Sequence, residues 1–377
     1  MPALRRRQGG EALLDFRIGS WRRFRQSGDQ PVLLRGGRLS LPPLTRVILR
    51  PHFRDKYGRI IAEARISVTD RCNFHCIYCQ PTPESTKEHR DHILSFEEIR
   101  LLAEILLERG VTKFRLTGGE PLVRKGLERL VAMLAALDGL NDLALTTNAY
   151  LLAEKAKPLA QAGLKRVNVS MDSLDRQRFA EMTRSDSLDK VHAGMDAAER
   201  VGLGPIKVNC VMMRGVNDAE AVDFARFARE TGRLVRFIEY MPFAPGGTWD
   251  LAMVVPGEEL QRRIAERYPL VPVPAGPEST AERYRFTDAP GEVGFITPVT
   301  NPFCGGCDRI RLTADGKIRS CLFARDEHDL KSLLRGGASR EQIDQAIERA
   351  VWVKEKGTER LLEQARDMNI SMASIGG

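Results

Sequence analysis

The sequence predicts an α/β protein built on a parallel sheet. Between residues 60 and 240, six strand-like runs alternate with helical stretches. Repeated strand–helix units place their strands side by side in parallel, because each helix carries the chain back to the same end of the sheet. An open doubly wound sheet and a curved partial barrel both agree with this pattern. Beyond residue 243 the alternation stops, and short strand-like runs between turn residues predict a smaller α+β region.

The elements of the first region are well marked. The predicted strands are Glu63–Val68, Lys113–Leu116, Asp142–Thr146, Arg166–Ser170, Ile206–Val211 and Leu234–Tyr240. The clearest helix follows the first strand. Ser95 and Glu98 have the spacing of a capping box, and apolar residues recur at helical spacing from Phe96 to Leu106. Gly110 ends this helix.

The second region is less regular. Further strands are predicted at Tyr284–Phe286, Val293–Thr297, Ile310–Thr313 and Lys317–Arg319, and helices at Asp329–Arg335 and Arg340–Lys354. Asp315-Gly316 is a typical hairpin turn. Residues 270–280 are proline-rich and predict a loop. We expect three parts: an extension over residues 1–52, a barrel over 53–243 and a C-terminal domain over 244–377.

The net charge of the chain is concentrated at its start. The 377 residues carry a formal charge of +8, and residues 1–50 hold eleven arginines, no lysine and three acidic residues. The remainder is neutral, unlike a nucleic-acid-binding protein. No apolar run is long enough to span a bilayer, and the arginine-rich start lacks the apolar stretch of a secretory signal. We expect a cytoplasmic protein with a disordered extension, or an organellar protein if the extension is a transit peptide.

Polar residues alternate with apolar ones along the predicted strands, which is unusual for parallel strands covered on both faces. The sets that share a face are Arg65 with Ser67, Lys113 with Arg115, Lys207 with Asn209, and Asn168 with Ser170 and Asp172; Arg236 lies between apolar neighbours. An unpaired buried charge is costly. We expect these faces to line a chamber for a charged ligand, although exposed strand rims give the same alternation. Cys210 lies on the opposite, apolar face and is expected in the core.

Two loops that follow predicted strands carry ligand-binding residue types. Thr117-Gly118-Gly119-Glu120-Pro121 follows the second strand, and its glycines let the backbone approach a ligand closely. Thr146-Thr147-Asn148 ends the third strand in a similar position. The next residue is Ala149, so the turn there has to accept a Cβ.

Six of the seven cysteines form two triads. The first is Cys72, Cys76 and Cys79, with the spacing C-x3-C-x2-C, and the second is Cys304, Cys307 and Cys321 around the predicted hairpin. Three thiolates leave one iron of a cubane cluster open to bind a small molecule. Zinc is the alternative at either triad, with His328 as a fourth ligand of the second. Arg309 and Arg311 share a strand face beside the second triad, where guanidiniums bind phosphate or form a solvated basic face.

The first triad resembles the signature of the radical S-adenosylmethionine (SAM) superfamily, in which C-x3-C-x-aromatic-C follows the first barrel strand. Tyr78 is the aromatic residue here. The resemblance implies a partial (β/α)6 TIM-type barrel with a C-terminal extension, and a [4Fe–4S] cluster on the first triad. In that superfamily the open iron binds SAM, and the reduced cluster cleaves it to methionine and a 5′-deoxyadenosyl radical.

Both triads together resemble the GTP 3′,8-cyclase family, also called the molybdenum cofactor biosynthesis protein A family. The resemblance rests on C-x2-C-x13-C with Arg309-x-Arg311 inside it and on the terminal Gly376-Gly377, and it covers about residues 55–377. It implies a second [4Fe–4S] cluster, on the second triad, that binds guanine. It also implies that the radical takes the 3′ hydrogen of GTP and that C3′ bonds to C8. The product is (8S)-3′,8-cyclo-7,8-dihydroguanosine 5′-triphosphate, a precursor of molybdopterin.

The resemblance further implies roles for single residues. The positions that match SAM contacts are Tyr78, Gly119, Ser170 and Met241. Those that match GTP contacts are Arg65, Arg115, Thr146, Lys207, Arg309 and Arg311, with Lys113 and Arg236 expected to hold the triphosphate. Gly376 and Gly377 are expected to reach into the active site and support catalysis. No other catalytic side chain is implied.

The expected partners are GTP, an external electron donor and, in the pathway, cyclic pyranopterin monophosphate synthase. The expected assembly is a homodimer. Two alternatives are a peptide-modifying radical SAM enzyme with an auxiliary cluster and a zinc-binding nucleic-acid module. A peptide does not need so many cations in the chamber, and the neutral body without interleaved aromatic and basic residues argues against nucleic acid.

Overall fold

A computed structural model describes residues 51–79, 92–243, 249–276 and 279–356, together with Met372 and Ile375, within one compact unit, Leu49–Gly377. The predictions for Gly376, Gly377 and nearly all of the N-terminal extension lie outside these residues. No helix in the described ranges is both long enough and apolar enough to cross a membrane.

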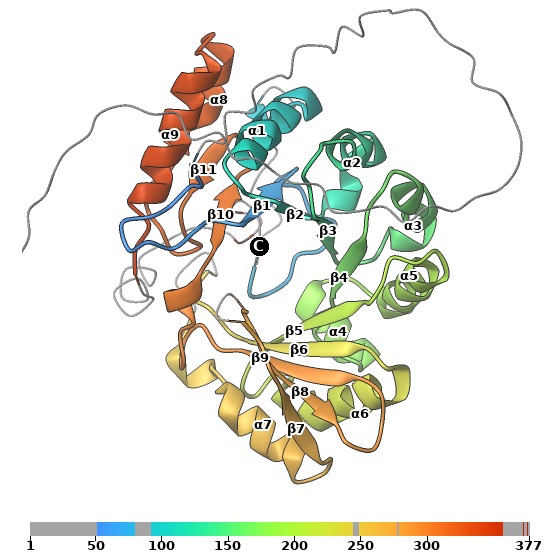
Figure 1. The fold of residues 1–377 in the computed structure, drawn as a ribbon. Helices are drawn as coiled ribbons and strands as arrows, with labels where there is room; N and C mark the ends of the chain where they lie inside the picture. Colours follow the sequence, from blue (N-terminus) through green and yellow to red (C-terminus); the bar gives the residue numbers. More distant parts are fainter. Residues whose placement is uncertain are drawn as a thin grey trace, which may run out of the picture. The chain divides into compact units, whose positions relative to one another are not determined.

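The first region alternates strands and helices as predicted (Figure 1). Its elements are β1 (Glu63–Ser67), α1 (Phe96–Glu108), β2 (Lys113–Thr117), α2 (Leu127–Ala135), β3 (Asp142–Thr147), α3 (Leu152–Gln161), β4 (Arg166–Ser170), α4 (Arg176–Thr183), α5 (Leu188–Arg200), β5 (Lys207–Met212), α6 (Ala221–Thr231) and β6 (Leu234–Glu239). Each strand pairs in parallel with the next. The predicted α/β fold with its partial barrel is therefore confirmed.

The second region extends the same sheet at both ends. Its elements are α7 (Gly257–Ala265), β7 (Leu270–Val273), β8 (Glu282–Phe286), β9 (Glu292–Ile296), β10 (Arg309–Leu312), β11 (Lys317–Arg319), β12 (His328–Asp329), α8 (Leu330–Arg335) and α9 (Arg340–Trp352). The described residues also include the 3₁₀ helices η2 (Pro121–Val123), η3 (Asp218–Glu220), η4 (Leu251–Met253) and η5 (Cys304–Gly306). β9 pairs in parallel with β6, and β10 pairs in parallel with β1. The strand order is β12-β11-β10-β1-β2-β3-β4-β5-β6-β9-β8-β7.

One prediction for this region is wrong. Part of the proline-rich segment over residues 270–280 is not a loop, because Leu270–Val273 forms β7 and pairs with β8. β7 is the last strand in the sheet order. An edge strand tolerates proline, since the missing N–H of Pro272 can face away from the neighbouring strand. Pairing with a distant segment has overridden the local signal.

The main core lies between the sheet and the helices on its outer side, where Figure 1 shows α1, α2, α3 and α5. Ile66, Leu116 and Val208 are fully buried there, and Cys210 is buried with them as predicted. The capping box of α1 is present, with the Glu98 amide donating to Ser95 Oγ at 3.0 Å. With the apolar strand faces buried against helices, the polar faces turn toward the inside of the curved sheet.

Candidate active site

The inner face of the sheet borders a cavity of about 460 Å³. All six cysteines of the two triads line it, and so does every described position predicted to contact SAM or GTP except Lys113: these are Tyr78, Gly119, Ser170, Met241, Arg65, Arg115, Thr146, Lys207, Arg236, Arg309 and Arg311. Lys113 is half-buried at the start of β2 but does not border the cavity. The predicted polar faces therefore line an inner chamber in large part, although Ser67, Lys113 and Asn168 on the same faces do not border it.

The loop that carries the first triad is held by its neighbours. His75 and Ile77 donate their amides to the carbonyls of Thr183 and Met182, at 3.0 and 2.9 Å, at the end of α4. The Phe74 amide donates to Cys72 Sγ at 3.4 Å. Burial, together with nearby Glu120 and Cys79, raises the pKa of Cys72 to about 12, although the amides of Phe74 and Asn73 act to lower it. Three thiols that line one cavity, with an amide that donates to Cys72 Sγ, fit the ligands of an iron–sulfur cluster.

The two glycines after β2 are required by a close approach between loops. A Cβ on Gly118 would lie 2.4 Å from the Thr69 carbonyl oxygen, and one on Gly119 would lie 2.4 Å from that of Arg71. The Gly119 amide donates to the Thr69 carbonyl at 2.8 Å. The sequence explained these glycines by the close approach of a ligand, and the structure adds a second reason for them. Their missing side chains also let this loop pack on the segment that leads into the first triad.

Buried Glu120 joins the two predicted ligand-binding loops. Its carboxylate accepts hydrogen bonds from the Leu122 amide at 2.9 Å, from Thr147 Oγ1 at 2.7 Å and from the Asn148 amide at 2.7 Å. Burial raises the pKa of Glu120 to about 7, although these donors favour the charged form. Ala149 follows with a φ of 60°, so the turn does accept a Cβ in the left-handed region.

Tyr78 is oriented by a carboxylate on the adjoining wall. Its hydroxyl donates to Asp172 Oδ2 at 2.7 Å, and the Val211 amide donates to Asp172 Oδ1 at 2.8 Å. Burial raises the pKa of Asp172 to about 6, against the effect of both donors. The alternation places Asp172 on the polar face with Ser170, but the sequence alone assigned it no role in the site.

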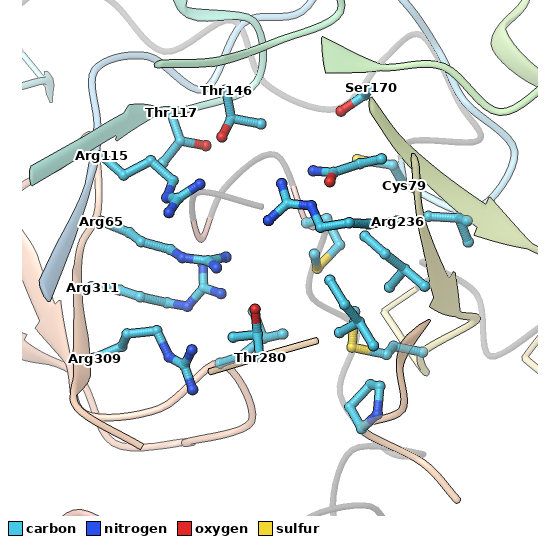
Figure 2. Close-up of a pocket in the computed structure, with 18 of the residues that line it drawn as sticks. Arg65, Cys79, Arg115, Thr117, Thr146, Ser170, Arg236, Thr280, Arg309 and Arg311 are labelled. Atoms are coloured by element: carbon cyan, nitrogen blue, oxygen red, sulfur yellow. The ribbon is translucent and has the colours of Figure 1, made fainter. Parts of the chain in front are cut away.

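Strand register explains how the arginines gather. Arg115, Arg65 and Arg311 are partners across β2, β1 and β10 and so form one row. The next row is Lys113, Glu63 and Arg309. Figure 2 shows Arg115, Arg65, Arg311 and Arg309 in a column along this wall, with Arg236 on β6 facing them across the cavity. Parallel neighbours project partner residues to the same side, which turns four dispersed arginines into one surface.

The wall that β10, β1 and β2 form beside the cavity has a net positive charge, because it carries four arginines and one carboxylate, Glu63. Burial acts to raise the pKa of Glu63, but Arg115, Arg65 and Arg309 overcome it and lower the pKa to about 2. Burial and repulsion from Arg115 and Arg65 lower the pKa of Arg236 to about 9. Within the described residues, the buried Nε atoms of Arg65 and Arg236 have no hydrogen-bond partner. An anionic ligand in the cavity would supply those partners.

Glu63→Gln should remove a pH-dependent part of the stability. The pKa of Glu63 lies below its ordinary value, so its stabilisation is present above about pH 4.5 and is lost as the pH falls toward 2. The shift corresponds to about 3 kcal/mol. We therefore expect the gap in unfolding free energy between wild type and Glu63→Gln to shrink by this amount over that range. Denaturant unfolding at several pH values measures it, with exposed Glu97→Gln as control; a gap independent of pH would contradict it.

The second triad lies beside a buried lysine. Lys354 Nζ donates to the carbonyl of Arg309 at 2.8 Å and also to that of Ser320. Burial acts to raise the pKa of Cys307, but Lys354 and Arg309 lower it to about 6. A thiolate at neutral pH is the form that binds metal. Lys354 follows α9 and is nearly inaccessible to solvent, and nothing in its local sequence distinguishes it from a surface lysine.

The described residues offer no ligand set for a single zinc ion, which was the alternative at either triad. Across the described ranges, no three Cys, His, Asp or Glu side chains come close enough together to hold a single metal ion. A cubane binds its three thiolates through different irons, so its ligands lie farther apart than those of one zinc ion. His328 pairs with Ile318 between β12 and β11 and is not among the residues that line the cavity.

The chain returns to the cavity near its end. Met372 lines the cavity, and Ile375 packs with Phe243 and Phe323 in a small apolar cluster. Arg311 Nη1 donates to the Ile375 carbonyl at 3.4 Å. The residue that precedes the terminal Gly-Gly therefore contacts one of the predicted GTP-binding arginines.

A partial barrel whose first strand leads into a three-cysteine loop on an inner cavity is the architecture of a radical SAM protein. The sequence pattern of the Radical SAM superfamily matches residues 66–228, and that of Molybdenum Cofactor Synthesis C matches residues 234–360. The fold also resembles Streptococcus suis SuiB bound to precursor peptide SuiA, with a TM-score of 0.56 and 14% identity over 83% of this chain and 69% of that one. At that identity the likeness shows the fold alone.

Close relatives identify the family. The chain is 47% identical to a GTP 3′,8-cyclase of Acidothermus cellulolyticus over 304 residues, 79% of this chain and 84% of that protein. It is 43% identical to a GTP 3′,8-cyclase of Thermodesulfovibrio yellowstonii over 326 residues, 86% of this chain and 100% of that protein. The chain belongs to the GTP 3′,8-cyclase family of the radical SAM superfamily. This membership implies SAM and a [4Fe–4S] cluster.

Proposed function

We propose that this chain is a radical SAM cyclase that converts GTP to (8S)-3′,8-cyclo-7,8-dihydroguanosine 5′-triphosphate in molybdenum cofactor biosynthesis. The observation that carries the proposal is that both cysteine triads and several arginines line the same cavity. Relatives with 43% and 47% identity that bear the name GTP 3′,8-cyclase support the substrate.

The first triad and its surroundings form the proposed SAM end of the cavity. Cys72, Cys76 and Cys79 would hold the first cluster, and SAM would contact Tyr78, Gly119, Ser170 and Met241. When bound, the cluster and SAM together would supply the radical that takes the 3′ hydrogen of GTP. C3′ would then bond to C8, and one further electron, which derives from the external donor, and one proton would complete the 7,8-dihydro product. The residues of the chain hold the two substrates in place and keep water from the radical. The Asp172 contact that orients Tyr78 supports this assignment.

The second triad would hold a second [4Fe–4S] cluster that binds the guanine. The low pKa of Cys307 supports this role, because it keeps the thiol ionised. Arg309 and Arg311 border the same end of the cavity. Gly376 and Gly377 are proposed to support catalysis there, and the contact between Arg311 and the Ile375 carbonyl agrees with that role.

The arginine wall would hold the triphosphate. A triphosphate carries about four negative charges, which the cations Arg65, Arg115, Lys207 and Arg236 can balance through charge-assisted hydrogen bonds. Their mutual repulsion supports an anion between them. So do the buried Nε atoms of Arg65 and Arg236, which have no hydrogen-bond partner among the described residues, although Arg65 Nε lies 3.7 Å from Glu63 Oε1. Lys113 does not border the cavity and is left out of the proposed contacts.

The reaction requires partners that supply electrons and consume the product. We propose an external one-electron donor for the first cluster and cyclic pyranopterin monophosphate synthase as the next enzyme. The homodimer and the location in the cytoplasm or an organelle are proposed from the family alone. Each is tested directly, by the mass of the protein in solution and by imaging of the full chain in its cell.

Product analysis tests the proposed reaction. The chain is reconstituted anaerobically with iron and sulfide, then incubated with SAM and dithionite and with either GTP or ATP. We expect 5′-deoxyadenosine and a cyclised guanine nucleotide in equal amounts with GTP, and neither above background with ATP. 5′-Deoxyadenosine formation that does not respond to GTP would overturn the substrate, and its absence from iron-loaded protein would overturn the radical reaction.

A further inference from the structure

Lys354 is a buried cation beside the second triad. It follows α9, is 1% exposed and lines the cavity together with Cys304, Cys307 and Cys321. Among the described residues, its ammonium donates to two carbonyl oxygens and forms no ion pair with a carboxylate. Neutral carbonyls offset only part of the free energy that the burial of an ammonium costs. The position of Lys354 therefore favours an anion close to it.

The two carbonyl groups lie at the strand ends that carry the triad. Arg309 begins β10 and comes two residues after Cys307, and Ser320 follows β11 and directly precedes Cys321. Lys354 Nζ donates to the Arg309 carbonyl at 2.8 Å and also to that of Ser320. Both carbonyls lie beyond the last pair of the antiparallel β10–β11 ladder. The ammonium thus links the two strands where their own pairing ends, beside both cysteines.

The third cysteine of the triad is held by a different cation. Arg59 Nη1 donates to the Cys304 carbonyl at 2.6 Å, and Nη2 donates to the Glu355 carbonyl at 2.5 Å. The charge of Arg59 is already balanced, because its Nε donates to buried Asp55 at 2.5 Å. The segment after α9 is therefore tied to all three parts of the triad, and Lys354 is the cation in it whose charge has no carboxylate partner among the described residues.

The negative charge that Lys354 lacks is available at the triad itself. A [4Fe–4S] core in its oxidised form, held by three thiolates, has a net negative charge, and one more electron makes it more negative. A cation buried beside such a group is weakly screened and favours the reduced form. The geometry thus gives Lys354 a counter-charge that no described side chain supplies.

We propose that Lys354 is the internal counter-ion of the second cluster and the bridge that positions two of its three ligands. This inference rests on the proposed function, which places a [4Fe–4S] cluster on the second triad. Lys354 is a positioning residue, since it acts on the cluster through charge and through the strand ends. Its charge raises the reduction potential of the second cluster, and its two hydrogen bonds keep Cys307 and Cys321 at the cavity.

The test isolates the second cluster and measures its potential. A full-length parent in which Cys72, Cys76 and Cys79 are all replaced by alanine leaves only the second triad to hold a cluster. After anaerobic reconstitution, redox titration of the electron paramagnetic resonance signal without nucleotide gives the reduction potential. Lys354→Gln in this parent keeps an N–H donor but loses the charge. It should shift the equilibrium about tenfold toward the oxidised cluster, which is a fall of about 59 mV for a one-electron couple.

Three further variants separate charge from packing. Lys354→Met loses both the charge and the donors, so its potential should fall at least as far and a chelator should remove its iron faster. Lys354→Arg keeps the charge and should keep the potential of the parent. Lys356→Met is the matched control, because Lys356 is exposed two residues further on and does not line the cavity, and it should change neither quantity.

Each outcome decides the inference. A parental potential in Lys354→Gln and Lys354→Met would overturn it and keep the proposed function. If both neutral variants lose their iron and Lys354→Arg retains it, the charge is needed for loading and the inference is supported; loss in all three would reduce the role to packing and overturn it. A parent that binds no iron would overturn the second cluster and the inference together. A lowered potential in a chain that makes no cyclised product from GTP would keep the inference and overturn the substrate.

Discussion

Replacing Cys72 with alanine should abolish reductive cleavage of SAM. Cys72 lines the cavity with Cys76 and Cys79, and a cluster held by only three thiolates does not tolerate the loss of one. The amide of Phe74, which donates to Cys72 Sγ, would lose its acceptor as well. We expect 5′-deoxyadenosine to fall to background, together with loss of about half the iron if two clusters are present. Both quantities are measured after anaerobic reconstitution.

Cys210→Ala provides the matched control for this change. Cys210 is equally a free thiol, but it is buried on the helix-covered side of β5 rather than in the cavity. The control should keep its iron and its SAM cleavage, with a modest loss of stability from the smaller core side chain. Normal 5′-deoxyadenosine production by Cys72→Ala would remove the first triad from the proposed chemistry.

Arg309→Ala should lower kcat/KM for GTP by about 10- to 100-fold, the size of one lost charge-assisted hydrogen bond. Arg309 lies at the end of the cavity that holds the second triad, and its guanidinium helps to lower the pKa of Cys307. The substitution therefore affects the proposed guanine end in two ways, through the lost cation and through the ionisation of the thiol. Binding of SAM should stay unchanged, because the first triad lies on a separate loop.

Two further variants make the result for Arg309 specific. Arg309→Lys keeps the charge but loses the planar fork, so it should recover part of the activity. Arg100→Ala removes a half-exposed arginine from α1 and should leave GTP turnover unchanged. Unchanged GTP affinity and turnover in Arg309→Ala would exclude Arg309 from the substrate site.

Local patterns in the sequence predicted much of the chamber. The alternation that pairs Arg65 with Ser67 and Lys207 with Asn209 indicated one polar face per strand, and the structure shows Arg65, Lys207 and Asn209 lining the cavity. The reasoning succeeded because side chains alternate strictly along a strand, so the identity of each face is a local property. It was less successful at Lys113, which shares a face with Arg115 and a row with Glu63 and Arg309 but does not border the cavity.

The residues that the sequence did not reveal act through contacts between distant segments. Glu63 faces Arg309 only because β10 pairs with β1, and Lys354 reaches the carbonyls of Arg309 and Ser320 only because the chain after α9 packs against β10 and β11. Neither position has a distinctive local spacing. The pairing of β9 with β6 likewise creates the row that joins Arg236 to Arg283.

The sequence by itself determined the strand–helix repeat, the two cysteine triads and the residues on each polar face, because periodicity and short spacings depend only on neighbours along the chain. The tertiary structure alone decided which rows of charge form, that the C-terminal strands extend the barrel at both ends, and that the glycines after β2 are packed against the loop before Cys72. Those features depend on register between strands that are far apart in the chain, and register is set by long-range packing rather than by local pattern.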